Sequence, residues 1–468
     1  MTARTALAGT AEAGASAAHA VPASRPVPSA SKRTPQAIAG TAAVVLLVAG
    51  GRWASHIAVG PVYVTDVLLA AAVLHMAVCR LLTGHRAGPT RGPGSLVVLV
   101  VLVVLATLVR VTASEGDALL IARDAAPFVY VAAAYLAARG YLLADEPGRQ
   151  RTARLLHGAL VVHLCWVAFV VLMPGFSVTL SQLWSGPVPQ VRPDLDTALL
   201  GVLAGASILR FRRDEGTWLN ALVAGVSLAL ALTMHSRAGL LACCVCVVVG
   251  LVGGAGRSPR ASARTLVLAV SAVVLLIVLL PSSPAAQRLM ASVDQAGVSR
   301  EVAAGAAGTS NARKVAWSRV IAFTLDDPAR LLVGVGFGPD FLKDAAADEA
   351  LGSQTYKGVR SPHNYLVTAF ARLGLLGLAM IVGLLVSIVA AAHRVLTERH
   401  HPDELTATCV LMALSLLVIA MLGVVLESPF GAVPFYWAGG VLLASRHRQR
   451  SSAAFHRIDR RSRIPCRR

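Results

Sequence analysis

The chain has 468 residues, of which 56% are hydrophobic and only 14% are charged. Such a composition excludes a soluble globular protein and predicts an all-α protein that crosses a membrane many times. The formal net charge of +19 is concentrated in the N-terminal arm, the C-terminal tail and alternate short loops. We therefore expect the basic tail to lie near anionic membrane lipids rather than to bind nucleic acid.

Residues 1–35 are rich in Ala, Ser, Thr and Pro and predict a disordered arm. The polar stretch is too long for a signal peptide, and no cleavage pattern follows the first apolar run. Apolar segments then recur along the chain, and they predict about twelve transmembrane helices. These segments lie at about 37–51, 62–82, 95–111, 118–138, 153–173, 196–211, 217–234, 238–255, 265–281, 364–393, 405–425 and 431–445.

Arginines gather in alternate links between these segments, and the positive-inside rule assigns such links to the cytoplasm. An even number of spans also requires both termini on one side, so we expect both to be cytoplasmic. This predicts a multi-pass protein of the cytoplasmic membrane. Its parts are a cytoplasmic arm at 1–35, spans 1 to 9 within 36–281, a large extracytoplasmic loop between spans 9 and 10 at 282–362, spans 10 to 12 within 363–446, and a basic cytoplasmic tail at 447–468.

Arg237 stands at the predicted outer end of the seventh span, in the sequence SRAG that begins at Ser236. A positive charge on this side opposes the topology rule and requires an anionic partner. That partner is either a lipid phosphate or a substrate diphosphate, whose oxygens match the donors of a guanidinium group. Arg192 lies on the same predicted face, before the sixth span, where it could contact substrate.

The loop at 282–362 is long enough that we expect it to be functional. Within it, residues 311–325 predict an amphipathic helix, which the DDP sequence at 326–328 ends. Arg313 lies near the start of this helix, and Trp317 four residues later could stack on a sugar or lie in the membrane interface. The expected apolar stripe consists of Ala316, Val320 and Phe323.

Three glycines follow this helix, at Gly334, Gly336 and Gly338, and they indicate a flexible turn. A glycine-rich phosphate loop is the alternative. No strand precedes these glycines and no GK[ST] sequence follows them, so we favour a turn against the membrane.

The stretch from Ser361 to Gly377 marks the start of the tenth span. Ser361 predicts an N-cap and Pro362 the first helical residue, which would place His363 in the first turn. An imidazole at a helix start is expected to have a lowered pKa and to remain neutral, so that it can act as a general base. The alternative is that His363 anchors the helix at the membrane interface. Gly374 and Gly377 share its stripe and would allow another helix to approach.

Glu427 lies in the predicted outer link between the last two spans, where it could orient the histidine or cap a helix. The cysteines at 243–246 stand in the middle of a helix without nearby histidines or acidic residues, so we expect packing there rather than metal binding.

These motifs together resemble those of the O-antigen ligase and O-antigen polymerase superfamily of membrane glycosyltransferases. His363 and Asn364, nine further residues, Gly374, two residues and Gly377 match its histidine motif, and the resemblance extends over about 190–440. Two other elements of the family are matched by residues of this chain, which are Ser236, Arg237 and Gly239, and then Arg313, Trp317, Pro328, Gly334 and Gly336.

The resemblance implies a GT-C-like fold and a metal-independent, inverting transfer that needs no cofactor. The donor would be a glycan on undecaprenyl diphosphate, and the acceptor a hydroxyl group outside the membrane. His363 would act as general base or position the acceptor, while Arg237 and Arg313 would hold the diphosphate. Ligase and polymerase are not distinguished. The residues expected to bind substrate are Ser236, Asn364, Trp317, Arg192 and Glu427.

A membrane transporter of a small anion or solute is the rival hypothesis. About twelve spans with both ends inside also describe one large transporter group, but the long loop of that group is central and cytoplasmic. Here the predicted loop is late and outside, and no internal repeat is visible. A membrane scaffold would leave His363, Arg237 and Arg313 unexplained.

Overall fold

The computed structural model describes residues 35–55, 57–59, 62–83, 94–173, 175, 191–212, 217–253, 267, 283, 286–287, 300–351, 360–397 and 402–462. The predicted arm at 1–35 and the first part of the predicted loop lie almost entirely outside this range. All described elements are helical except one hairpin, in which β1 (Ala58–Val59) pairs antiparallel with β2 (Val62–Tyr63). This hairpin was not predicted from the sequence.

Helices follow one another along the rest of the described chain. In order they are α1 (Pro35–Ala54), α2 (Val64–Thr83), α3 (Gly94–Thr112), α4 (Ala118–Val129), α5 (Ala132–Leu143), α6 (Glu146–Leu172), α8 (Pro193–Arg212), α9 (Trp218–Thr233), α10 (Arg237–Val252), α13 (Arg300–Leu325), α14 (Pro328–Val333), α15 (Phe341–Asp344), α16 (Tyr365–Thr397), α17 (Glu404–Ala420), the 3-10 turn η1 (Val425–Glu427) and α18 (Pro429–Ser462).

Every predicted span coincides with helix except the one at 265–281, which apart from Val267 lies outside the described residues. The predicted span at 118–138 is divided between α4 and α5. Within the described range, four helical segments are long and apolar enough to cross a membrane: Gly94–Thr112, Ala118–Leu143, Glu146–Leu172 and Tyr365–Thr397. Five shorter apolar helices accompany them. The total of twelve spans and their orientation stay predictions.

Helix α8 lies in the middle of the buried core, where it packs against α9, α10 and α17. Small residues allow this close packing, because a Cβ added at Gly201 would lie 2.6 Å from Cys243 Cα, and one at Gly205 would lie 2.6 Å from the carbonyl oxygen of Cys246. Cys243 and Cys246 are therefore buried packing residues of α10.

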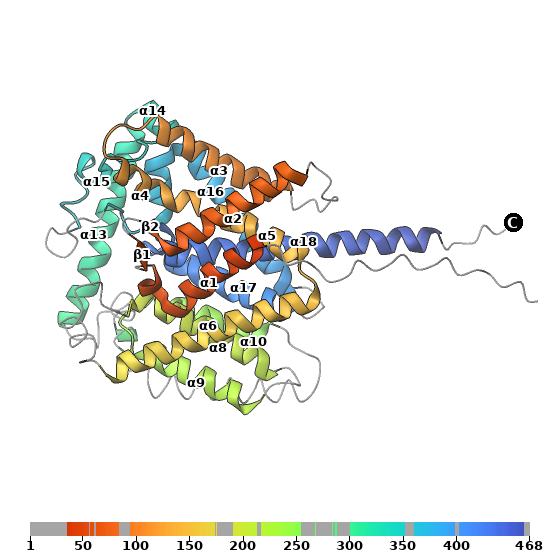
Figure 1. Ribbon diagram of the computed structural model, residues 1–468. Coiled ribbons are helices and arrows are strands. Elements are labelled where there is room, and N and C mark those ends of the chain that lie inside the picture. The colour runs from red at the N-terminus through yellow and green to blue at the C-terminus, as the bar shows by residue number, and fades with distance from the viewer. Residues whose placement is uncertain are drawn as a thin grey trace, which may run out of the picture. The chain divides into compact units, whose positions relative to one another are not determined.

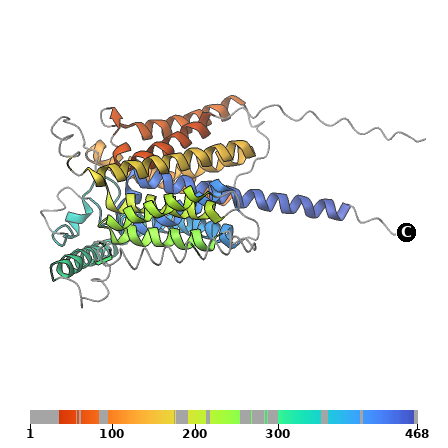
Figure 2. The ribbon, with the colours of Figure 1, turned by 90° about the horizontal axis from the view of Figure 1, so that it is seen from below.

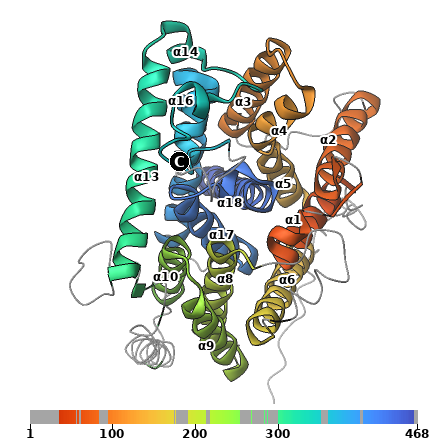
Figure 3. The ribbon, with the colours of Figure 1, turned by 90° about the vertical axis from the view of Figure 1, so that its left-hand side faces the viewer.

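Helices α13, α14 and α15 lie together at one end of the other helices, and α13 packs against α14, α15 and α16 (Figures 1 and 3). The predicted helix at 311–325 is confirmed, although α13 already begins at Arg300. Ala316 and Val320 are fully buried, and Phe323 packs against the same cluster, which includes Phe341. The apolar stripe of α13 thus packs against the buried cluster around Phe341, as the spacing of these residues predicted.

Helix α18 continues as far as Ser462 and extends beyond the other helices (Figure 2). The helix thus continues past the boundary predicted at 446 into the basic sequence, and the boundary between the last span and the tail stays a prediction. Arginines have a high helix propensity, and a net positive charge does not by itself end a helix.

Candidate functional site

The start of α16 differs from the predicted start in a way that moves His363. The helix begins at Tyr365, and the side-chain oxygen of Asn364 accepts hydrogen bonds from the backbone N–H groups of Leu366 (3.0 Å) and Val367 (3.2 Å). Asn364 is thus the N-cap. Ser361 Oγ instead accepts from the N–H of His363 at 3.2 Å, in a turn before the helix. The predicted cap at Ser361 was wrong because a second good capping residue lies closer to the apolar run.

His363 itself lies outside the helix, with a left-handed backbone of φ +58°. It is half-buried, and its pKa is lowered from the ordinary 6.5 to about 4. Burial is the largest cause, the positive charges of Arg313 and Arg192 act in the same direction, and Asp194 opposes them. The predicted neutral imidazole is supported, although its cause is desolvation and two guanidinium groups rather than a place in the first helical turn.

Arg313 and Trp317 extend from successive turns of α13 toward the same place, as their spacing of four residues requires. Arg313 Nη1 donates to the carbonyl oxygen of Leu422 at 2.7 Å, and Trp317 Nε1 donates to that of Pro362 at 2.5 Å. The Nε atom of Arg313 is buried and makes no hydrogen bond within the described part of the chain. Arg313 therefore retains a donor for a further acceptor.

Arg192 lies just before α8 and forms a two-point ion pair with Asp194. The Nε–Oδ1 distance is 2.8 Å and the Nη2–Oδ2 distance is 3.1 Å. Its guanidinium carbon lies 4.7 Å from the ring centroid of Phe430 at the start of α18. Asp194 neutralises much of this charge, so we expect Arg192 to hold the geometry more than to supply net positive charge.

The link between α17 and α18 connects these groups. Asn364 Nδ2 donates to the carbonyl oxygen of Met421 at 3.2 Å, next to the carbonyl of Leu422 that Arg313 binds. Glu427 Oε1 accepts from Thr368 Oγ1 at 2.9 Å, and burial raises its pKa to about 7 against hydrogen bonds from Ser361 and Thr368. Glu427 is therefore hydrogen-bonded to Ser361, two residues before His363.

Arg237 and Ser236 occupy the neighbouring helix start. Ser236 Oγ accepts from the N–H of Gly239 at 3.0 Å and is the N-cap of α10, while Arg237 is the first helical residue and is half-buried. A Cβ added at Gly239 would lie 3.0 Å from the carbonyl oxygen of Asp194, so α10 starts against the start of α8. The guanidinium groups of Arg313 and Arg192 lower the pKa of His363.

The motif glycines join the turn after α14 to α16. Helix α16 kinks at Gly374 (φ 63°, ψ −163°), and a Cβ there would lie 2.4 Å from the carbonyl carbon of Leu332. A Cβ at Gly334 (φ 74°) would likewise lie 2.3 Å from the carbonyl carbon of Arg372. Gly374 therefore admits the end of α14, which is the close approach of another helix that was predicted there. The continuous stripe predicted from His363 was wrong, because the kink interrupts the helical period.

The kink also supplies hydrogen-bond acceptors to the turn. The carbonyl oxygens of Ala371 and Arg372 accept from the N–H groups of Val335 (2.8 Å) and Gly336 (3.1 Å). The glycine turn was predicted as flexible, whereas it is hydrogen-bonded along its length. Gly377 has a different role, since a Cβ there would lie 2.0 Å from Leu373 Cβ of the same helix.

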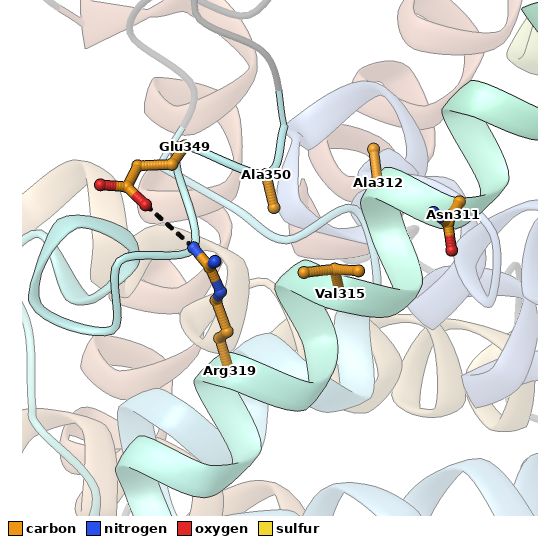
Figure 4. Close-up of a pocket in the computed structure, with 6 residues that line it drawn as sticks. All are labelled: Asn311, Ala312, Val315, Arg319, Glu349 and Ala350. Carbon is orange, nitrogen blue, oxygen red and sulfur yellow. Dashed lines mark hydrogen bonds and ion pairs between the residues drawn. The ribbon is translucent and has the colours of Figure 1, made fainter.

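An open hollow of about 370 Å³ lies against another face of α13 (Figure 4). Arg319 crosses toward Glu349 at its edge, with an Nη1–Oε2 distance of 3.2 Å. This hollow does not include His363 or its partners. It is lined by Asn311, Ala312, Val315, Arg319, Glu349 and Ala350.

The structure thus links six of the predicted site residues through the ends of α8, α13, α16 and α17, and their chemical roles stay predictions. These residues are His363, Arg313, Arg192, Asn364, Trp317 and Glu427. Within the described residues, no group of three or more His, Cys, Asp or Glu side chains could hold a metal ion.

Comparison with known proteins gives one family. A family model described as O-antigen ligase matches residues 221–382. This range includes Ser236, Arg237, Arg313, His363 and the kink of α16, whereas Arg192 and Glu427 lie outside it. No curated protein matches the chain.

Proposed function

From the match of residues 221–382 to the O-antigen ligase family, we propose that this chain belongs to the O-antigen ligase and polymerase superfamily and transfers a glycan from undecaprenyl diphosphate to an acceptor hydroxyl group. The reaction takes place at the outer face of the cytoplasmic membrane. The observation that carries this proposal is a neutral imidazole at His363 beside Arg313, which retains a buried N–H donor. A base and a diphosphate-binding cation are the two groups that a metal-free glycosyl transfer requires.

His363 is the general base in this proposal. Its ring nitrogen takes the proton of the acceptor hydroxyl group while the oxygen attacks the anomeric carbon of the donor sugar. The bond from this carbon to the diphosphate oxygen breaks, and attack from the opposite face inverts the anomeric configuration. A pKa of about 4 makes a weak base. Binding of a diphosphate would counter the charges of Arg313 and Arg192 and raise this pKa toward the working pH.

Arg313 stabilises the leaving undecaprenyl diphosphate. Negative charge grows on the diphosphate oxygen as the glycosidic bond breaks, and a preorganised guanidinium group offsets it without reorganisation of solvent. Arg237 and Ser236 extend this anion site from the start of α10. Arg192 is held by Asp194 and orients the site, and Trp317 offers an aromatic face for a sugar.

A ligase and a polymerase differ in the acceptor, so either activity fits these residues. The orientation in this proposal places both termini in the cytoplasm and 282–362 outside. Metal independence and the absence of a cofactor are part of the same proposal, and transfer in the presence of a chelator tests them.

The test is glycan transfer by the full chain in vesicles that contain a lipid-linked oligosaccharide donor and an acceptor. We expect His363→Ala to lower transfer by about 100-fold or more, because the base is lost, and the donor to accumulate. The control is His393→Ala, at the exposed far end of α16. Transfer by His363→Ala at the unaltered rate, or a changed uptake of small solutes with unchanged glycan, would contradict the proposal and favour a transporter.

A further inference from the structure

A buried carboxylate on α4, that of Asp124, lies between two arginines from distant parts of the chain. Asp124 Oδ2 lies 2.7 Å from Arg372 Nη2 and 3.0 Å from Arg360 Nη2. The side chains are 7%, 2% and 14% exposed for Asp124, Arg372 and Arg360. Ion pairs with this little solvent are worth far more than surface pairs, provided that their hydrogen bonds are satisfied.

Backbone groups of the turn between α14 and α15 complete these hydrogen bonds. The N–H of Gly338 donates to Asp124 Oδ2 at 3.2 Å, and Arg360 Nη2 donates to the carbonyl oxygens of Gly338 and Pro339. Arg372 Nη1 donates to the carbonyl oxygens of Gly336 (3.1 Å) and Pro339 (2.8 Å). We call the set formed by Asp124, Arg360, Arg372 and the backbone of 336–339 the Asp124 junction.

Arg360 connects this junction to the histidine, because it precedes His363 by three residues. Alternate residues of the segment 360–364 are bound to three different elements. Arg360 is bound to α4 through Asp124, the carbonyl oxygen of Pro362 accepts from Trp317 of α13, and the side chain of Asn364 donates to Met421 after α17. His363 is therefore held on both sides.

Such support is needed because His363 adopts a left-handed backbone conformation that side chains other than glycine rarely adopt. A non-glycine residue remains in this conformation only where its surroundings hold it. The bonds at Pro362 and Asn364 are single hydrogen bonds to backbone oxygens. The bond at Arg360 is an ion pair with hydrogen bonds to both oxygens of Asp124, at 3.4 and 3.0 Å, and is the strongest of the three.

We propose that Asp124 and Arg360 are positioning residues for His363: their ion pair fastens the segment 360–363 to α4 and so sets the direction of the imidazole. Neither residue needs to contact substrate. The inference rests on the proposed function for what His363 does, but the placement of the imidazole can be measured without glycan transfer.

The decisive variant is Arg360→Met, which removes the pair to the histidine segment but leaves Arg372 paired with Asp124. We expect kcat for transfer to fall by about 10- to 100-fold with little change in the KM for the donor, because the base is displaced rather than the binding site lost. Arg360→Lys should restore part of the rate, since it keeps the charge but not both hydrogen bonds. The control is Arg319→Met. Arg319 also binds a carboxylate and a carbonyl oxygen, those of Glu349 and Ala346, but these lie outside the segment 360–363.

The second measurement is the rate at which diethyl pyrocarbonate modifies His363, followed by mass spectrometry of the full chain. This reagent modifies neutral imidazole. With a pKa of about 4, set by burial, Arg313, Arg192 and Asp194, the rate in the unaltered protein should vary little between pH 5 and 7. In Arg360→Met the freed imidazole is more solvated, so its pKa moves toward 6.5, and the rate should rise at pH 7 and fall as the pH is lowered to 5.

Asp124→Asn should change the rate at which His363 is modified in the same direction as Arg360→Met does. Unchanged modification of His363 and unchanged kcat in Arg360→Met would overturn the inference, and so would equal effects in Arg319→Met. If the unaltered protein transfers no glycan at all, the proposed function fails. The modification rates then still decide whether Asp124 and Arg360 position the histidine.

Discussion

At His363, burial and two guanidinium groups act in the same direction on one imidazole. Both disfavour the charged form, so the ring is neutral over the physiological pH range. In the proposed reaction Arg313 also attracts the anionic donor, whose binding would counter the effect of this arginine on the ring. The affinity of the site for a diphosphate and the basicity of its histidine are therefore coupled, and a change at Arg313 should alter both.

Replacing Arg313 by Met tests this coupling. We expect transfer at pH 7 to fall by about 100-fold, as is typical when one electrostatic donor of a reaction site is lost. Because Arg313 lowers the pKa of His363, its removal should raise that pKa, and modification of His363 by diethyl pyrocarbonate should slow more between pH 7 and pH 5 than in the unaltered protein. The measurements are the pH profiles of transfer and of modification.

Lys314→Met is the matched control, since it removes the neighbouring positive charge from the exposed side of α13. An equal loss of transfer in Lys314→Met would show that the general charge of this helix attracts the donor. A pH profile of modification that Arg313→Met leaves unchanged would show that the charge of Arg313 does not act on His363.

Among the elements, α16 combines a predictable and an unpredictable part. The apolar sequence of α16 predicted a long helix, and the structure has one. The cap at Asn364, the kink at Gly374 and the turn that fills it depend on contacts with residues far away in the sequence, which helical periodicity does not encode. Arg372 shows this clearly, because its carboxylate partner Asp124 precedes it by more than half of the described range.

The site shows the same division. Sequence motifs indicated His363 and Arg313, which carry local signals in a helix start and an amphipathic helix. Arg360 carries no such signal, since a charge next to an apolar segment is ordinary in a membrane protein. Asp124 lies within the predicted span at 118–138, where a charge requires a partner, but the sequence does not indicate that this partner comes from 360–372. The partner of Arg192 was within reach of the sequence, because Asp194 follows it by two residues.

Replacing Gly374 by Ala tests the kink of α16. A left-handed backbone alone costs a residue other than glycine about 1–2 kcal/mol, and the new Cβ would also lie 2.4 Å from the carbonyl carbon of Leu332. We therefore expect a lower midpoint in thermal unfolding of the purified protein in detergent. The control is Gly383→Ala in the same helix, where a Cβ would meet only Leu99 Cδ2 at 3.7 Å.

Gly383→Ala should be neutral or stabilise the protein by about 0.5–1 kcal/mol, as expected for Ala in place of Gly within a helix. Similar midpoints for the two variants would indicate that α16 can straighten without cost. In that case the contact between the turn after α14 and the kink would not contribute to stability.

For the whole molecule, the proposal requires His363 and the basic links to face opposite sides of the membrane. Helix α16 has 33 residues, a length of about 50 Å if it were straight, which exceeds a hydrocarbon core of about 30 Å. The proposal therefore places its two ends on opposite sides. Its first end carries His363 beside α13, and its last turn carries Arg394, which the positive-inside rule assigns to the cytoplasm.

Single cysteines in a chain whose seven native cysteines have been replaced test this orientation. Ser318→Cys, exposed on α13, should react in intact cells with a maleimide that cannot cross the membrane. Gln150 is exposed near the start of α6 and Thr397 at the end of α16, both on the predicted cytoplasmic side. Gln150→Cys and Thr397→Cys should therefore react only after the membrane is permeabilised. Labelling in the reverse pattern would place His363 on the cytoplasmic side. A glycan donor presented outside could not reach the imidazole there, so neither the positive charge of Arg313 nor the positioning of His363 could serve the proposed transfer.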